Sequence, residues 1–232
     1  VHATWDDWFV REEVEAAEPE GLSAWFLGCN GFVFRTPEVT VYLDPYFGDG
    51  EPPRLLRLPA VPMDAADATA CDAVLVTHEH LDHMHPPSYE PLVDLGATLY
   101  APGASFAEPD CDVDTSHHPE RYETVAVGDS FEIGDLTIYV RDANDPDAIE
   151  PVSYVIEHES GTFFHGGDSR PAEAFPAIGE ECDLDVGALA FGSVGRRYYP
   201  DADETRAYHV YMDENDVVAA ANSLEIDRLL PT

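Results

Sequence analysis

The chain has 232 residues, of which 44% are hydrophobic and 11% aromatic, a composition that excludes a disordered polypeptide and allows a substantial core. Its 47 acidic residues against 11 basic ones give a formal net charge of −36, and every basic residue is an arginine. No basic patch is visible that could neutralise phosphates, so we expect no nucleic-acid partner.

The acidic excess has three interpretations: cation binding, repulsion of anionic partners, and adaptation to high intracellular salt. Acidic residues are spread along the chain and are not gathered in one tail. We favour salt adaptation, because a Debye length of about 3 Å at molar salt screens the self-repulsion of such a surface. The sequence shows no signal peptide and no apolar run of membrane-spanning length. We therefore expect a cytoplasmic protein of a high-salt organism, with no membrane partner.

The chain order of apolar runs predicts an α/β fold in a single domain, residues 1–232. The first 20 residues carry aromatic side chains among acidic ones, which predicts an amphipathic helix packed on the rest of the chain. We expect strands at Ser23–Leu27, Gly31–Arg35, Thr40–Leu43, Ala73–Val76, Thr98–Ala101, Thr124–Val127, Ser130–Ile133, Leu136–Val140, Val152–Glu157, Thr162–His165, Val186–Phe191 and Arg228–Leu230. We expect helices at Pro86–Leu95, Pro171–Ile178 and Glu214–Leu224, with irregular proline-rich structure at 48–70.

A dense group of potential metal ligands follows the apolar run Ala73–Val76. The next residues read Thr77-His78-Glu79-His80-Leu81-Asp82-His83. Imidazole nitrogens and carboxylate oxygens suit zinc, iron(II) or manganese. On a tight loop after a strand, His78 and His80 project to one side, while Asp82 and His83 can reach a second metal. The alternative is a solvated, histidine-rich loop.

The Thr-His-x-His-x-Asp-His pattern at 77–83 resembles the signature of the metallo-β-lactamase superfamily. Tyr42–Tyr46 is similar to the family's first motif, and Phe163–Ser169 to its fourth. The resemblance spans about residues 23–232 and implies a four-layer αββα sandwich with a binuclear metal site at the sheet edges. Gly28–Phe32 and Met212–Val218 most resemble the ascorbate-6-phosphate lactonase-like branch of Zn- or Mn-dependent hydrolases.

The resemblance implies a role for each residue that matches these motifs. His78 and His80 would bind one metal. Asp82 and His83 would bind the other, and Asp168 would bridge the two. Asp82 and His83 are also the candidate catalytic residues, since Asp82 can relay a proton to the leaving group.

Two stretches depart from the family pattern. The third motif usually supplies a histidine, but Val140–Pro146 has none, so Asp142 or Asp145 could ligate a metal there and tilt the preference from zinc toward manganese. A plain Asx-rich turn is the alternative for either aspartate. The fifth motif is a histidine that would follow Leu229–Thr232, so we expect the C-terminal end of the domain to be missing.

Two further side chains receive roles beside the metals. We expect Asp44 to orient a ligand histidine through its free ring N–H. Arg170, next to the fourth motif, is the candidate for binding a substrate phosphate or carboxylate, and a salt bridge explains it as well. Arg196-Arg197 is a weaker anion-binding candidate. His85, His117-His118, His165 and His209 are expected to lie outside the metal site.

The predicted function is therefore a metal-dependent hydrolase with two divalent metal ions, Zn or Mn, that activate water. The expected partner is a small-molecule substrate: an ester, a lactone or a phosphorylated metabolite. One alternative is a phosphodiesterase or nuclease on the same fold. Another is a non-catalytic metal-binding protein, given the unusual third motif. A homo-oligomer remains open.

Overall fold

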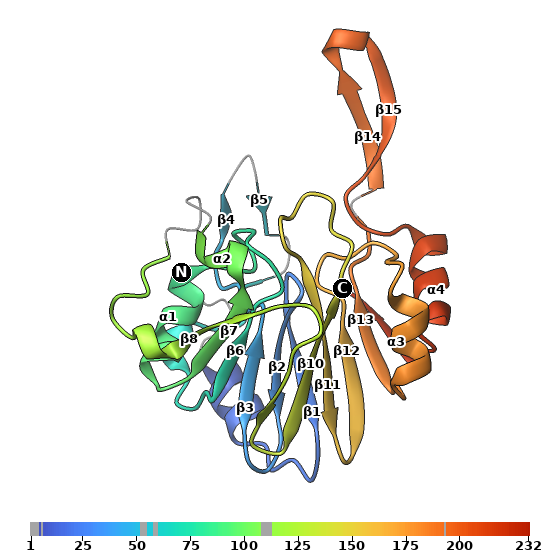
Figure 1. The fold of residues 1–232 in the computed structure, drawn as a ribbon. Coiled ribbons are helices and arrows are strands. Elements are labelled where there is room, and N and C mark those ends of the chain that lie inside the picture. Colours follow the sequence, from blue (N-terminus) through green and yellow to red (C-terminus); the bar gives the residue numbers. More distant parts are fainter. Residues whose placement is uncertain (1–4, 6, 52–54, 58–59, 108–112, 193) are drawn as a thin grey trace.

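The computed structural model describes residues 5, 7–51, 55–57, 60–107, 113–192 and 194–232. Two six-stranded sheets pack face to face (Figure 1). The first has the order β1 (Ser23–Gly28), β2 (Gly31–Arg35), β3 (Thr40–Leu43), β6 (Ala73–Leu75), β7 (Thr98–Pro102) and β8 (Tyr122–Val125). The second has the order β16 (Arg228–Pro231), β13 (Val186–Leu189), β12 (Gly161–His165), β11 (Val152–His158), β10 (Leu136–Asp142) and β9 (Ser130–Ile133).

Strand direction brings the chemically interesting loops to one end of the molecule. In the first sheet β3 and β6 are parallel neighbours, so the residues after Leu43 and after Leu75 meet at the same edge. In the second sheet β10 and β12 both pair antiparallel with β11, so they run in the same direction and also end at one edge. The loops that follow these four strands can therefore share one site.

Three apolar clusters define four layers. The central cluster joins the facing sides of the two sheets, where the rings of Phe34 and Phe163 lie 4.9 Å apart. A second cluster covers the outer side of the first sheet with helices η1 (Phe9–Glu15) and α1 (Pro86–Asp94). A third covers the outer side of the second sheet with α3 (Phe175–Glu181) and α4 (Glu214–Ser223). The predicted αββα arrangement is confirmed.

The N-terminal segment packs on the first sheet, as its apolar pattern predicts. Phe9, Val10 and Val14 are buried, and Arg35 donates from Nη1 to the carbonyl oxygens of Glu15 and Ala17. The helix is short, seven residues, and has π-helical hydrogen bonding.

A hairpin at 194–209 was not expected. Strands β14 (Val194–Tyr199) and β15 (Glu204–His209) pair antiparallel around the short helix η5 (Pro200–Ala202). Figure 1 shows this hairpin rising from the end of the body where the loops meet. The run Arg-Arg-Tyr-Tyr lacks the apolar–polar alternation that signals a half-buried strand, so the sequence contains no indication of β14. Smaller elements are β4 (Gly50–Glu51), β5 (Leu55–Leu56), α2 (Gly103–Ala107), η2 (Ala65–Asp67) and η4 (Pro119–Arg121).

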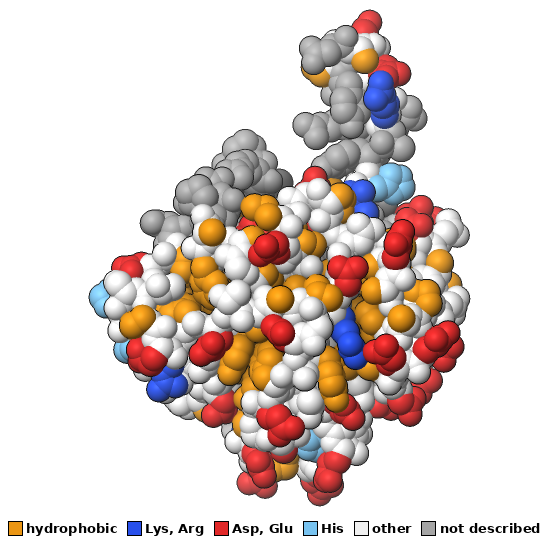
Figure 2. Space-filling model, viewed as in Figure 1, with side chains coloured by type: hydrophobic (Ala, Val, Ile, Leu, Met, Phe, Trp, Pro, Cys, Tyr) orange, Lys and Arg blue, Asp and Glu red, His pale blue; other side chains and the backbone are white. Residues whose placement is uncertain are grey.

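The surface carries the acidic excess of the sequence. Figure 2 shows aspartate and glutamate side chains scattered over the whole visible face of the body, with few arginines among them. Among the described residues, helices are too short or too polar to cross a bilayer.

Candidate metal centre

The histidine run is anchored through the residue that precedes it. The backbone N–H of Thr77 donates to Oδ1 of Asp44 at 2.8 Å, and its hydroxyl donates to Oδ2 at 2.7 Å. Asp44 is fully buried at the end of β3 and has a positive φ of 44°. A carboxylate that accepts two such bonds is fixed in place, and it holds the start of the run against the first sheet.

The outward nitrogen of each run histidine meets an acceptor, which settles which nitrogen faces inward. The Thr77 hydroxyl gives its hydrogen to Asp44, so it can only accept from Nδ1 of His78, at 2.9 Å. Nε2 of His80 donates to the carbonyl of Asp147 at 3.2 Å, and Nδ1 of His83 donates to Asp44 Oδ2 at 2.9 Å. Hydrogen bonds of this kind fix the ring and tautomer of a metal-ligating histidine.

The inward nitrogens of His78 and His80 lie so close together that a cation between them would stabilise the pair. Nε2 of His78 and Nδ1 of His80 lie 2.8 Å apart. With both outward nitrogens protonated, two neutral rings would present lone pairs to one another. A cation with bonds of about 2.0–2.1 Å to each nitrogen resolves that conflict, since its neighbouring ligand atoms lie about 3 Å apart.

The second sheet supplies two carboxylates to the same place. Asp168 follows β12 and accepts from Nδ2 of Asn30 at 2.6 Å. The loop that carries it can approach so closely because Gly167 has φ +55° and a Cβ there would lie 2.9 Å from the Thr77 hydroxyl. Asp145, in the loop after β10, has its Oδ2 3.6 Å from His78 Nε2 and 3.7 Å from His80 Nδ1.

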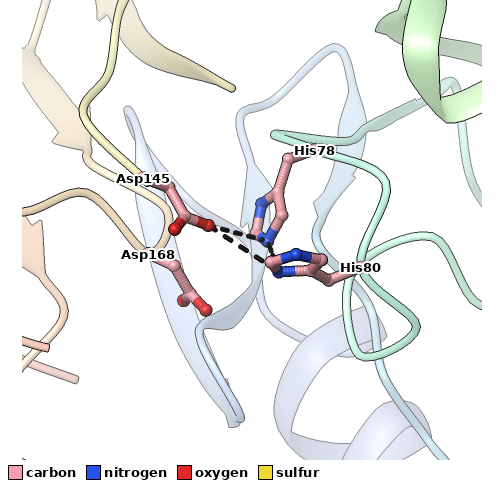
Figure 3. Close-up of side chains that lie close together, drawn as sticks. All are labelled: His78, His80, Asp145 and Asp168. Atoms are coloured by element: carbon pink, nitrogen blue, oxygen red, sulfur yellow. Dashed lines mark hydrogen bonds and ion pairs between the residues drawn. The ribbon is translucent and has the colours of Figure 1, made fainter. Parts of the chain in front are cut away.

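Four of the predicted ligands therefore lie together (Figure 3). His78, His80, Asp145 and Asp168 each offer an atom within 4.8 Å of the others. Buried Oδ2 of Asp145 has no hydrogen-bond partner among the described residues. Two imidazole nitrogens beside two carboxylate oxygens, one of them unpartnered, fit a divalent cation. Asp142, the other candidate for the third motif, is exposed at the end of β10 and is not part of this group.

His83 and Asp82 also lie near Asp168. Nε2 of His83 is 3.3 Å from Oδ1 of Asp168. Burial raises the pKa of Asp82, with His83 opposing that shift and Asp168 adding to it, so its carboxyl group lies within electrostatic reach of both. Asp168 is therefore close both to the His78 group and to His83, as the predicted bridging role requires.

The close contacts among these side chains shift their pKa values. Burial disfavours the charged form of His83, but Asp168 and Asp44 outweigh it, so the pKa of His83 is raised well above its usual value. Burial also disfavours a charged Asp168, yet its pKa is lowered because His83 lies beside it. Burial and the neighbouring His83 lower the pKa of His78, which keeps that ring neutral. A neutral imidazole is the form that binds metal.

The structure gives Arg170 a contact that the sequence did not predict. Its Nε donates to the carbonyl of Val210 at 3.2 Å and its Nη2 to that of His209 at 3.1 Å. The guanidinium thus fastens the end of the 194–209 hairpin to the Asp168 loop. A contact with substrate stays a prediction.

The other histidines lie outside the group, as expected. His165 is buried, and its Nε2 donates to the carbonyl of Asn30 at 2.8 Å. His85 contacts Ser88 through Nδ1 at 2.6 Å and the ring of Tyr46. His118 pairs with Asp94 at 3.3 Å on the surface. The side chains of Arg196 and Arg197 lie outside the described residues.

Two residues near Asp168 were missed from the sequence. Asn30 lies in the β1–β2 turn, and a positive φ of 63° aims its amide at Asp168. Tyr211 follows the hairpin, and its side chain hydrogen-bonds to Asp168; burial and that carboxylate raise the pKa of the phenol. Asparagine in a Gly-Cys-Asn-Gly turn was a usable signal for Asn30. Nothing in the sequence placed Tyr211 beside a residue so far away in the chain.

Comparison with known proteins agrees with this geometry. Residues 40–232 match the family model described as the beta-lactamase superfamily domain. The chain belongs to the metallo-β-lactamase superfamily. It is 26% identical over 278 aligned positions to a probable L-ascorbate-6-phosphate lactonase, UlaG, from Salmonella gallinarum, covering 98% of this chain and 73% of that protein. The predicted superfamily is confirmed, and the similarity to this lactonase agrees with the predicted branch.

Solved structures share the fold at low sequence identity. Igni18, a metallo hydrolase from the archaeon Ignicoccus hospitalis, superposes with a TM-score of 0.65 at 17% identity, covering 91% of this chain and 82% of that one. An isothiocyanate hydrolase from Delia radicum gut bacteria gives 0.63 at 16% identity, covering 91% and 84%. With the family match, these relatives identify the chain as a metal-dependent hydrolase.

Proposed function

We propose that this hydrolase cleaves a small ester or lactone, including phosphorylated ones, with water activated at two divalent cations, zinc or manganese. The observation that supports this best is the convergence of His78, His80, Asp145 and Asp168 from loops of both sheets. The curated relative named for a phosphorylated lactone supports the substrate class. The substrate itself is the part that needs experiment.

The position of each ligand residue suggests which of the two cations it would hold. His78, His80 and Asp145 would hold the first cation, His83 and Asp82 the second, and Asp168 would contact both. When bound, the two cations lower the pKa of water toward neutrality and stabilise negative charge on the attacked carbonyl or phosphoryl group.

Proton movement falls to Asp82. Burial raises the pKa of its carboxyl group, which suits a group that accepts a proton and passes it to the leaving oxygen. The phenol of Tyr211 donates to Asp168 and limits how that carboxylate can turn. Asp44 keeps the His83 ring in one orientation by accepting from its Nδ1.

The test is a substrate panel in molar KCl and in dilute buffer, with and without chelator. Simple lactones, sugar lactones with and without a phosphate, aryl esters and a generic phosphodiester form the panel. We expect lactone or ester turnover that disappears on chelation and returns with added zinc or manganese. Turnover of the phosphodiester alone would show a phosphodiesterase instead. Stoichiometric metal without any turnover would favour a metal-binding protein.

A further inference from the structure

The hairpin of β14 and β15, residues 194–209, stands away from the body of the molecule (Figure 1). Its two strands form a sheet of their own, and among the described residues none of the hairpin belongs to an apolar cluster. A two-stranded hairpin on its own is at best marginally stable in water. We infer that this hairpin is a dimerisation arm, which packs against the same hairpin of a second copy of this chain.

The foot of the arm is fixed to the body. Arg170 donates to the carbonyl oxygens of His209 and Val210 at 3.1 and 3.2 Å. On the other strand, the N–H of Gly192 donates to the carbonyl of Met212 at 3.0 Å. The arm therefore leaves the body in a defined direction, and the strands beyond the foot are free to meet another molecule.

The composition of the arm differs from that of the remaining chain. Residues 194–209 hold three of the 11 arginines and three of the 11 tyrosines, with three acidic residues, so their net charge is zero in a chain of −36. Tyrosine and arginine are enriched at protein interfaces and in their binding hot spots, whereas aspartate and glutamate are depleted. The composition therefore indicates a contact surface. The residues concerned are Arg196, Arg197, Arg206, Tyr198, Tyr199, Tyr208, Asp201, Asp203 and Glu204.

The strand register places two arginines opposite one another. Arg197 of β14 is the cross-strand partner of Arg206 of β15, and Tyr199 is the partner of Glu204. Residues two apart along a strand share a face, so these four residues lie on the same face of the arm. Arg206 forms an ion pair with Glu204, and both side chains are exposed, at 59% and 46%. Like charges directly opposite destabilise a hairpin, and an acidic group from another molecule would reverse that effect.

The order of charges along the arm is self-complementary. The arginines lie within the strands, while Asp201, Asp203 and Glu204 lie at the turn or directly after it. When two such arms lie antiparallel, the acidic turn of each meets the arginines of the other, and every contact forms twice. A two-fold dimer interface needs a patch that is complementary to itself. An unrelated acidic protein would satisfy the arginines but repel the acidic turn, so a second copy fits the charges better.

The size of the arm sets the expected affinity. Each strand has six residues, a length of about 20 Å at about 3.3 Å per residue. The contact is therefore smaller than a standard interface, which uses about 20–30 residues a side. Phe191 at the foot is 43% exposed and can extend the contact onto the body. We expect a dissociation constant in the micromolar range, which a concentration series resolves.

The experiment measures the oligomeric state of the full chain by sedimentation velocity across a concentration series, at one fixed molar concentration of KCl. Ion pairs inside a contact are screened less by salt than exposed ones, so their loss remains measurable. The arginine variant combines Arg197→Glu and Arg206→Glu, which keeps like charges opposite one another within the hairpin. The turn variant combines Asp201→Arg and Glu204→Arg.

A control for net charge combines Glu18→Arg and Glu20→Arg. Both residues are exposed near the N-terminus, and the change in charge equals that of the turn variant. This control should dimerise like the wild type. Melting temperature and far-ultraviolet circular dichroism show whether each variant is folded.

We expect the arginine variant and the turn variant each to dimerise about tenfold more weakly or worse, because like charges then meet twice in every dimer. An equal mixture of the two variants should dimerise like the wild type, since every contact between the two arms again joins opposite charges. Mixing cannot restore the ion pair that Glu204 and Arg206 form within one chain. Recovery on mixing therefore identifies a contact between chains.

A second variant replaces residues 195–208 by a short Gly-Ser link and serves if a charge-reversed hairpin does not fold. It should sediment as a monomer at every concentration. A dimer that survives this replacement, or that is unchanged by both charge reversals, would overturn the inference. So would reversals that dissociate the dimer without recovery on mixing. A monomeric wild type would also overturn it, and the hydrolase assignment would stand in each case.

Discussion

The histidine side and the carboxylate side of this centre are held by different kinds of contact. His78 and His83 come from one short run, and their outward nitrogens meet buried side chains of the first sheet. Asp145 and Asp168 come from two loops of the second sheet, and much of their support is backbone or amide donors. The first side, the metal platform, is built from residues that are adjacent in the chain. The second must be assembled from distant ones.

That difference separates what each side contributes. The histidine side fixes where cations can lie, because its rings have one usable nitrogen each. The carboxylate side would supply negative charge around a bound cation. Substitutions on the two sides should therefore have different effects on metal binding and turnover.

The largest effect is expected for Asp168→Asn, since this carboxylate contacts both sides. Replacing an outer partner of a metal ligand costs about 10–100-fold in affinity or activity; removal of the shared ligand should cost at least the upper figure. Turnover of the best panel substrate and bound metal per chain are the measurements. Asp183→Asn, the same change at an exposed position, is the control. Full metal content and activity in Asp168→Asn would contradict the bridging role.

Asp44→Asn tests the platform alone. The amide keeps the size of the carboxylate but offers an N–H toward His83 and Thr77, where only acceptors are useful. We expect metal affinity to fall by about 10–100-fold, as for other outer partners of ligand histidines. Metal titration of the stripped protein measures it. The affinities for zinc and for manganese should fall alike, because no ligand atom changes, and unchanged affinities would contradict the positioning role of Asp44.

Tyr211→Phe tests one contact on the carboxylate side. The substitution removes the phenol that hydrogen-bonds to Asp168 while keeping the ring. A hydrogen bond to a charged group contributes about 1.5–3 kcal/mol, so we expect kcat to fall by about tenfold or somewhat more. KM and bound metal should change little. A loss confined to metal content would mean that Tyr211 acts on cation binding alone.

His85→Gln should have the smallest effect, and it concerns stability rather than the centre. Burial lowers the pKa of His85 to about 4 from 6.5. Because the unfolded chain takes up this proton near pH 6.5 and the folded chain resists until about pH 4, stability falls across that window as the pH drops. We expect the melting temperature of the variant to fall a few degrees less between pH 7 and pH 4.5.

The exposed His117→Gln is the matched control for that measurement. It should show the same acid sensitivity as the wild type. Equal sensitivity in His85→Gln would place the acid-labile group elsewhere, and the metal platform would be the first place to look.

The sequence predicted the platform better than the carboxylate side, for a physical reason. The ligands of the His78–His83 run are neighbours along the chain, and a buried strand before them limits where their side chains can point. The choice between Asp142 and Asp145 depended on a turn three residues beyond a strand end, which no spacing rule resolves. Tyr211 is far from Asp168 in the sequence, and the backbone beside it is held by Arg170 and by residues 190–192.

Most strands were predicted within one or two residues, because apolar runs between glycine, proline and asparagine turns define them. The helix expected at Pro171–Ile178 begins later, at Phe175, and runs to Glu181. The hairpin of β14 and β15 was missed because its sequence lacks the apolar–polar alternation from which strands are predicted.

The position of the centre, where loops of the two sheets meet, has a consequence for folding and stability. A cation there would be coordinated by loops from both sheets and would therefore cross-link the two halves of the chain. The complete ligand set forms only after the two sheets have packed together, so cation uptake would report the last stage of folding. Cation binding would also raise the free energy of unfolding, by about 2.7 kcal/mol at a free cation concentration one hundred times the dissociation constant. Chelation should then loosen the loop end of the sandwich and leave the opposite end, where β1 begins at Ser23 and β2 ends at Arg35, comparatively unchanged.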